Sequence, residues 1–266
     1  MSDLITEIDG PVARLRLNRP DVRNAFNDAL IRDLKQAFET LGADPDVRAI
    51  LLSGEGKTFS AGADLAWMRR AADMSLDDNQ ADAVGLAEML HAMATCDTPV
   101  ITLVHGAAMG GGAGLVAASD MVVAVAGTRF AFSEVKLGLT PATISPYVVA
   151  AMGARQARRY FLTGEIFTAE TAHALSLVHH VAEDRHAAEA TAQGWIAALL
   201  GNAPGAVSAA KHLIREVDGA PLGPGLQKLT AHRIAERRTS DEAREGIDAF
   251  LEKRKARWAA DGETGA

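Results

Sequence analysis

The sequence of 266 residues is long enough for one large domain, or for a core with a helical extension. Acidic residues outnumber basic ones by 34 to 27, and the net charge of −7 argues against a general nucleic-acid-binding protein. No run approaches about 18 consecutive apolar residues, so we expect no membrane-spanning helix and no membrane partner.

The one cysteine of the chain, Cys96, excludes an intrachain disulfide. Residues 1–7 lack the basic and apolar regions of a secretory signal, which predicts a cytoplasmic location. The histidines have no spacing that suits metal ligation, and we therefore predict no bound metal.

Strand and helix signals alternate through the first 200 residues. Asn27 is placed to cap a helix whose apolar face continues to Leu41 and which ends at Gly42. After residue 202 the pattern becomes mainly helical, with the clearest break at 219–225. Apolar runs typical of strands occupy residues 13–17, 48–52, 99–104, 121–125 and 178–181.

Two glycine-containing turns follow two of these strands. Residues 60–65 are similar to residues 110–115, which indicates a weak repeat that delivers both turns to one site. The glycines could serve only the close packing of a helix against a strand. The second turn also precedes a helix, however, and free N–H groups at a helix start favour an anion.

Glu134 lies in the mostly apolar segment 130–137. A lone glutamate is more often a solvated or ion-paired surface residue. Burial among these apolar neighbours would raise the pKa of Glu134 and suit it to proton transfer near neutrality. We therefore interpret Glu134 as the single acid–base group of an enzyme.

Two polar features keep two interpretations each. Asp64 could cap a helix that begins at Leu65, or it could position a ligand. The basic run 250–258 is either a solvated helix face or a phosphate contact.

A dinucleotide-binding motif is a weaker interpretation of the same glycines. Residues 112–117 match G-x-G-x-x-A, and Glu134 follows at about 20 residues, where a ribose-binding acid is expected. That motif should follow its strand directly, whereas residues 105–111 intervene after Val104. The match is therefore superficial, and the sequence has no P-loop motif.

Five segments, in order, resemble the crotonase, or enoyl-CoA hydratase/isomerase, superfamily: 17–26, 54–65, 105–112, 133–141 and 250–254. Within it, residues 63–68, 112–116 and 141–149 resemble bacterial 3-methylglutaconyl-CoA or γ-carboxygeranoyl-CoA hydratases. The resemblance implies an α/β fold with a spiral of ββα repeats over 1–200. It also implies a helical region, 201–266, that takes part in homotrimer or homohexamer assembly.

The resemblance further implies an acyl-CoA thioester as ligand, with coenzyme A as part of the substrate and no separate cofactor. The backbone N–H groups of Ala63 and Gly111 would bind the thioester oxygen as an enolate develops. The acyl pocket is expected between residues 67–93 and 140–147. The expected substrate contacts are Arg23, Ala25, Ala61, Asp64, Leu65 and Gly110, together with Phe250 and Lys253 across a subunit interface.

The chain departs from the family pattern at Gly114, where two-acid hydratases carry a glutamate. A double-bond isomerase needs one acid–base group, so mechanistic economy favours an isomerase, whereas the narrower resemblance favours a hydratase. We predict a hydratase that uses Glu134, with an isomerase or a non-catalytic acyl-CoA-binding protein as alternatives. If the acyl group carries a carboxylate, Arg69 or Arg70 could pair with it, although solvated arginines are expected there.

Overall fold

A computed structural model describes residues 2–260 of the chain. Its central sheet has six strands in the order β1-β2-β3-β4-β6-β9. The first two strands are antiparallel and the remaining pairs are parallel. These strands are β1 (Leu4–Asp9), β2 (Val12–Leu17), β3 (Ala49–Gly54), β4 (Val100–Val104), β6 (Met121–Val125) and β9 (His180–Ala182).

A second, three-stranded sheet has the order β5-β7-β8 and is formed by β5 (Ala107–Met109), β7 (Arg129–Ala131) and β8 (Phe167–Thr168). The predicted strands are confirmed, but the one expected at 178–181 begins only at His180. The reason is that the N–H of Val178 donates to the carbonyl oxygen of Ala172 at the end of a helix rather than to a strand.

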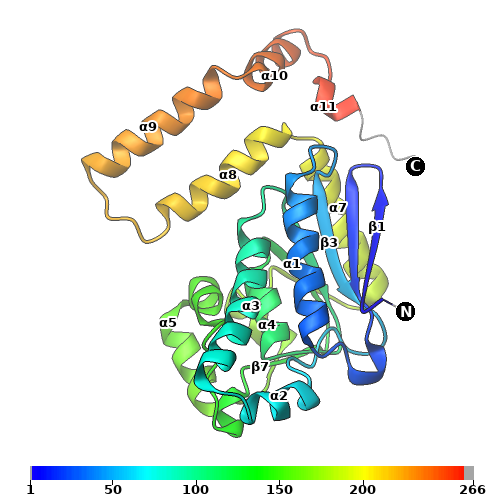
Figure 1. Cartoon of the computed structure of the whole chain (residues 1–266). Coiled ribbons are helices and arrows are strands. Elements are labelled where there is room, and N and C mark those ends of the chain that lie inside the picture. The colour runs from blue at the N-terminus through cyan, green and yellow to red at the C-terminus, as the bar shows by residue number, and fades with distance from the viewer. Residues whose placement is uncertain (1, 261–266) are drawn as a thin grey trace.

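Helices cover both faces of the six-stranded sheet. Because side chains alternate along a strand, Leu51 packs with the helix on one face while Ile50 and Leu52 join the larger core on the other. The first face is covered by α7 (Arg185–Leu200). The larger core is closed by α1 (Asp28–Ala43), α3 (Leu76–Thr95), α4 (Gly111–Ala118) and α5 (Ser145–Thr163); in Figure 1, α1 lies beside the sheet and α5 lies farther out, beyond α3 and α4.

The capped helix predicted after Asn27 is confirmed. The Asn27 side chain accepts a hydrogen bond from the N–H of Leu30 at 2.8 Å, and the helix ends at Ala43. Its buried face includes Leu34, Phe38 and Leu41. The remaining short elements of this region are the 3-10 helices η1 (Pro20–Val22) and η2 (Glu134–Leu137), and the helices α2 (Leu65–Ala72) and α6 (Ala169–Ala174).

The chain from residue 204 to 260 is helical and extends away from the sheet, as Figure 1 shows. We call α8 (Pro204–Val217), α9 (Pro224–Arg238) and α10 (Asp241–Leu251) the arm; α11 (Arg257–Ala260) follows it. The predicted break lies between α8 and α9. Residues 261–266 of the expected helical region lie outside the described residues.

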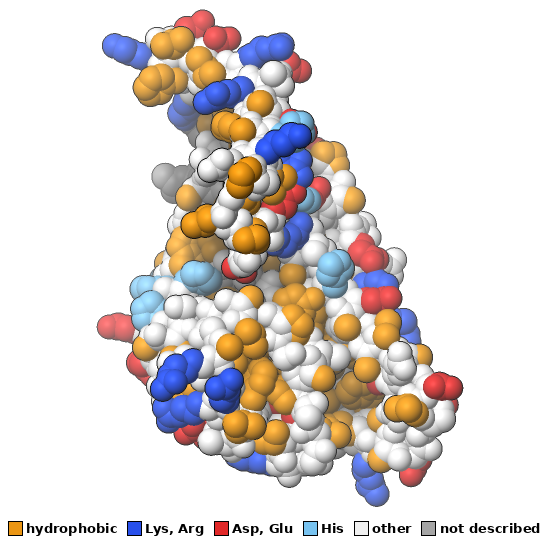
Figure 2. Space-filling model, turned by 90° about the vertical axis from the view of Figure 1, so that its left-hand side faces the viewer, with side chains coloured by type: hydrophobic (Ala, Val, Ile, Leu, Met, Phe, Trp, Pro, Cys, Tyr) orange, Lys and Arg blue, Asp and Glu red, His pale blue; other side chains and the backbone are white. Residues whose placement is uncertain are grey.

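The arm carries many exposed apolar side chains, and Figure 2 shows hydrophobic side chains along it. Helix α9 has no buried residue. The large exposed apolar residues of the arm are Ile214, Ile234, Ile247, Phe250 and Leu251, and Leu222 is exposed in the loop between α8 and α9. None of the helices within residues 2–260 is long and apolar enough to cross a membrane.

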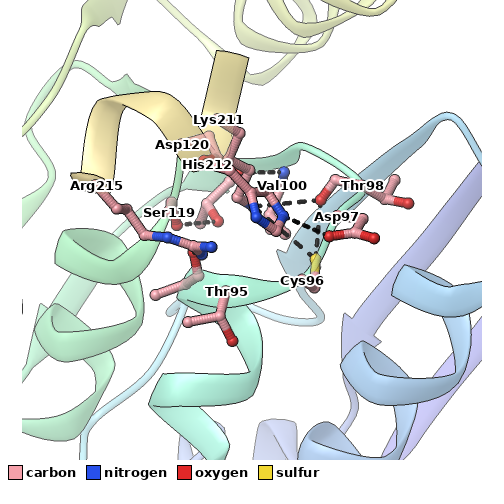
Figure 3. Close-up of polar contacts among 12 residues, drawn as sticks. Thr95, Cys96, Asp97, Thr98, Val100, Ser119, Asp120, Lys211, His212 and Arg215 are labelled. Carbon is pink, nitrogen blue, oxygen red and sulfur yellow. Dashed lines mark hydrogen bonds and ion pairs between the residues drawn. The ribbon is translucent and has the colours of Figure 1, made fainter. Parts of the chain in front are cut away.

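A polar cluster attaches α8 to the core (Figure 3). The buried Lys211 ammonium forms an ion pair of 2.6 Å with Asp120 and donates to the carbonyl oxygen of Thr98 at 3.4 Å. On the next residue of α8, the His212 ring contacts Asp97 at 2.6 Å. Since Asp120 also accepts the N–H of Val100, the cluster fixes the start of the arm to strand β4.

Candidate active site

The second glycine turn and the Glu134 segment leave the smaller sheet side by side. Strands β5 and β7 are parallel, with Met109 opposite Ala131, so their carboxyl ends lie at one edge. The N–H of Gly110 donates to the carbonyl oxygen of Ala131 at 2.9 Å. This pairing brings Gly110 next to Glu134, which follows β7.

The first glycine turn joins the second, as the sequence repeat predicts. Ser60 bridges to Ala108, and its carbonyl oxygen accepts the N–H of Met109 at 3.0 Å. Gly62 has φ of +86°, and a Cβ added there would lie 2.7 Å from the carbonyl oxygen of Met109 and 3.6 Å from the nitrogen of Gly111. Glycine is therefore required at this close approach of the two turns.

At this junction the backbone N–H groups of Ala63 and Gly111 have no hydrogen-bond acceptor among residues 2–260. The neighbours of Ala63 pair with Phe26, since Gly62 accepts from it and Asp64 donates to it. Because N–H directions alternate along an extended segment, the N–H of Ala63 points away from Phe26. Gly111 is the first residue of α4, where an N–H has no partner inside the helix.

Glu134 lies against this junction with its carboxylate half-buried. A Cβ added to Gly110 would lie 3.1 Å from Oε1 of Glu134, while Oε2 is buried without a hydrogen-bond partner. Burial raises the pKa of Glu134 above its ordinary value of 4.5. No charged neighbour contributes to this shift; desolvation raises the pKa, a hydrogen bond from the backbone of Glu134 itself opposes the rise, and desolvation is the larger effect.

A cavity of about 610 Å³ contains both turns and Glu134. Its walls come from the expected regions, because residues of α2 and α3 form one side and residues 139–144 another. The lining residues are Phe26, Ala61, Gly62, Ala63, Trp67, Met68, Ala71, Ala72, Asn79, Asp82, Ala83, Leu86, Gly110, Gly111, Ser133, Glu134, Leu137, Leu139, Thr140, Pro141, Ala142, Thr143 and Ile144.

Gly114 is buried in α4 beneath Ile144. A Cβ at position 114 would lie 2.3 Å from Cγ2 and 3.0 Å from Cβ of Ile144. Any larger side chain therefore needs Ile144 to move. The cavity accordingly has Glu134 on one side and an isoleucine, rather than a second acid, over position 114.

The sequence model of one protein family, enoyl-CoA hydratase/isomerase, matches residues 7–261. The chain belongs to this family. A Thermus thermophilus protein provisionally named enoyl-CoA hydratase is 37% identical over 249 residues, which cover 94% of this chain and 98% of that protein. The trans-2-decenoyl-[acyl-carrier-protein] isomerase of Streptococcus mutans is 30% identical, with 96% and 97% of the two chains covered.

The fold of the enoyl-CoA hydratase/isomerase family is also present. The crystal structure of an enoyl-CoA hydratase from Shewanella pealeana matches with a TM-score of 0.93 at 42% identity, covering 96% of each chain. The predicted crotonase-like α/β fold with a helical C-terminal region is thereby confirmed.

In this member of the family, Asp64 does cap a helix. Its side chain accepts from the N–H groups of Ala66 at 2.8 Å and Trp67 at 3.4 Å. It also pairs with Arg19 at 3.2 Å. Partial burial opposes ionisation, but these three donors hold the pKa of Asp64 below its usual value. A ligand-positioning role for Asp64 stays a prediction.

The loop with the expected substrate contacts Arg23 and Ala25 is joined to the loop with Ala61 and Asp64 by two residues, whose roles the sequence did not reveal. Arg19 donates to the carbonyl oxygen of Ala25 as well as to Asp64. The fully buried Asn24 accepts from the N–H of Arg19 at 2.8 Å and donates to the carbonyl oxygens of Glu55 and Thr58. Both residues lie in the largely polar segment 18–24, so no local signal separates them from solvated neighbours.

The predicted substrate contacts fall into two groups. The N–H of Ala61 donates to the carbonyl oxygen of Arg23 at 2.9 Å, so these residues meet beside the cavity, and Leu65 begins α2 directly after Asp64. Phe250 lies in the last turn of α10 and Lys253 follows that helix, which Figure 1 shows at the opposite end of the molecule from α2, and neither residue lines the cavity. Within one chain they do not join the site.

Two of the histidines, His105 and His179, have structural contacts. His179 accepts the N–H of Val122 at 3.1 Å through Nδ1, and the buried His105 contacts the carbonyl oxygen of Gly56 at 3.0 Å. Over residues 2–260, no group of three or more His, Cys, Asp or Glu side chains gathers as a metal site would require. The absence of a metal or separate cofactor in the reaction stays a prediction.

Proposed function

We propose that this protein is an enoyl-CoA hydratase that uses Glu134 as its only acid–base group. The observation that carries the proposal is a single cavity in which the N–H groups of Ala63 and Gly111, which have no acceptor in the described structure, lie beside the desolvated carboxylate of Glu134. Preorganised donors of this kind stabilise an oxyanion and are worth about 3–4 kcal/mol each in other enzymes.

The arrangement supports a single-acid hydration. The Glu134 carboxylate takes a proton from water as the water oxygen bonds to Cβ of the enoyl thioester. The double-bond electrons then form an enolate, whose oxygen accepts hydrogen bonds from Ala63 and Gly111. The resulting carboxylic acid gives its proton to Cα, which restores the Glu134 carboxylate and completes the addition of water.

Double-bond isomerisation is the second candidate, and the contact between Gly114 and Ile144 favours it. Isomerisation moves one proton from one carbon to another, so it needs no second acid. With Ile144 over position 114, that position offers no acid, and Glu134 is the carboxylate that lies against Gly110 beside the two N–H groups. The isomerase among the relatives agrees with this alternative, whereas the hydratases agree with the first.

The coenzyme A part of the substrate is proposed to lie along Arg23, Ala25, Ala61, Asp64 and Leu65. Phe250 and Lys253 would add contacts from a neighbouring subunit, since neither lines the cavity of its own chain and Figure 1 shows α10 far from α2. The exposed apolar residues of the arm support assembly with copies of the same chain as a trimer or hexamer. Light scattering on the purified protein tests this, and a monomer would contradict it.

The decisive experiment incubates the pure protein with crotonyl-CoA, 3-methylglutaconyl-CoA and a 3-enoyl-CoA, and follows each ester by mass spectrometry. We expect a gain of one water that Glu134→Gln abolishes and Glu183→Gln, an exposed matched control, retains. A product of unchanged mass with a shifted double bond would favour the isomerase. No conversion of any ester would leave an acyl-CoA-binding role.

A further inference from the structure

The charged residues of the cavity are all acidic. Asp82 and Glu134 line it, and none of the described lining residues is a lysine, arginine or histidine. Asp82 belongs to α3, which with α2 forms one wall of the cavity, and we expect the acyl part of a substrate held at Ala63 and Gly111 to meet this wall. The described lining of the cavity therefore presents two carboxylates and no cationic side chain.

Asp82 is fixed in place by Trp67. The indole Nε1–H of Trp67 donates to Oδ1 of Asp82 at 3.1 Å and joins α2 to α3 across the cavity wall. Among nearby charged groups, the carboxylate of Asp28 raises the pKa of Asp82, and the guanidinium of Arg70 lowers it. Burial raises the pKa of Asp82, while the Trp67 hydrogen bond favours its ionised form.

The two arginines that could have received a substrate carboxylate are not in the cavity wall. Arg70 pairs with Asp28 at 3.3 Å, and its side chain is 58% exposed. Arg69 is exposed as well. The polar donors that do line this wall are engaged, because Trp67 donates to Asp82 and the Asn79 amide donates to the carbonyl oxygen of Ala71 at 2.8 Å.

A second carboxylate against the α2–α3 wall would consequently lose water without gaining a cation or a free donor there, because the hydroxyl groups of the lining, on Ser133, Thr140 and Thr143, belong to the segment 133–143. Desolvation of an unpaired anion is costly, and a like charge at close range adds repulsion. An uncharged chain meets no such penalty against the apolar remainder of the wall, which includes Met68, Leu86 and Ile144.

We infer that the cavity selects acyl chains without a second carboxylate, and that Asp82 is the residue that enforces this selection. The inference rests on the proposed acyl-CoA function and narrows its substrate class to uncharged enoyl thioesters. It disfavours 3-methylglutaconyl-CoA, the ester that the narrower sequence resemblance indicates.

The test compares two esters that differ only in a terminal methyl or carboxylate: 3-methylpent-2-enoyl-CoA and 3-methylglutaconyl-CoA. Dissociation constants are measured by calorimetry in the Glu134→Gln background, where no turnover interferes, and kcat/KM is measured with the wild-type site. We expect the uncharged ester to be favoured at least tenfold in both measurements. Asp82→Asn, which keeps an acceptor for Trp67, should reduce that preference about tenfold.

Asp77→Asn is the matched control, since it removes the same charge from an exposed position of the same helix and should leave the preference unchanged. Equal or tighter binding of 3-methylglutaconyl-CoA would overturn the inference, and loss of that binding in Arg70→Ala would assign the carboxylate to Arg70 instead. Failure of the proposed function gives a different result, namely selective binding of the uncharged ester without turnover of either.

Discussion

Ile144 occupies the space that a side chain at position 114 would need. A Cβ on Gly114 would lie 2.3 Å from Cγ2 of Ile144, well inside van der Waals contact. Gly114 belongs to α4, and Ile144 directly precedes α5. The same packing contact therefore explains why position 114 carries no acid and why Ile144 forms part of the cavity wall.

This contact predicts a strong coupling between the two positions. Gly114→Ala should destabilise the protein by about 1–3 kcal/mol through overpacking, less the helix-propensity gain of about 1 kcal/mol. In an Ile144→Ala background the methyl group has room, and Gly114→Ala should become neutral or stabilising. Urea unfolding of the four proteins gives the coupling energy, and additive effects would show that the contact is absent.

Burial of Glu134 predicts that Glu134→Gln stabilises the fold at neutral pH. The pKa is raised above 4.5 in the folded protein, so ionisation costs folding free energy as pH rises from 4.5 through the folded pKa. Below pH 4.5 both states are protonated and the cost disappears. The melting temperatures of the wild-type protein and Glu134→Gln should therefore differ above this pH window and converge below it. A variant that melts lower at neutral pH would contradict the desolvated carboxylate.

Gly110→Ala is expected to impair turnover more than binding. Gly110 has φ of +49° and ψ of −119°, a conformation that costs a non-glycine residue about 1–3 kcal/mol. The added methyl would also lie 3.1 Å from Oε1 of Glu134 and displace the carboxylate. We expect kcat to fall at least tenfold with the coenzyme A affinity nearly unchanged. Gly85→Ala, where an added Cβ meets nothing within 4 Å, is the control.

The Lys211–Asp120 pair predicts that breaking it destabilises the attachment of the arm. Lys211→Met leaves Asp120 without its cation and should cost about 3 kcal/mol, whereas Lys211→Met with Asp120→Asn should cost less. His212→Ala removes the neighbouring exposed pair and should cost under about 1 kcal/mol. Denaturant unfolding of these variants checks the order, and an equal loss from His212→Ala would refute it.

Local features of the sequence predicted much of this structure. The Asn27 cap, the break between α8 and α9, and the meeting of the two glycine turns each depend on residues close in sequence or on strand order. Burial of Glu134 was also indicated by its apolar neighbours, and the structure places Phe130 and Phe132 in the core. In each case the local chemistry and the tertiary structure favour the same arrangement.

The remaining features depend on contacts between distant segments. Ile144 over Gly114, and Asp82 beside Trp67, join positions whose distance apart in space is set by helix packing rather than by any local pattern. Arg19 and Asn24 likewise act through loops about 40 residues away, which no periodicity reveals. A buried Asn or an Asp in an apolar wall becomes interpretable only when its partners are known.

The position of Cys96 under α8 gives the protein a natural reporter. Its Sγ lies 3.9 Å from the Lys211 ammonium and is buried where the arm meets the core (Figure 3). Burial raises the pKa of the thiol, which keeps it in its unreactive form. Because the chain has no other thiol, the rate at which a reagent labels Cys96 reports how often this junction opens, without any engineered probe.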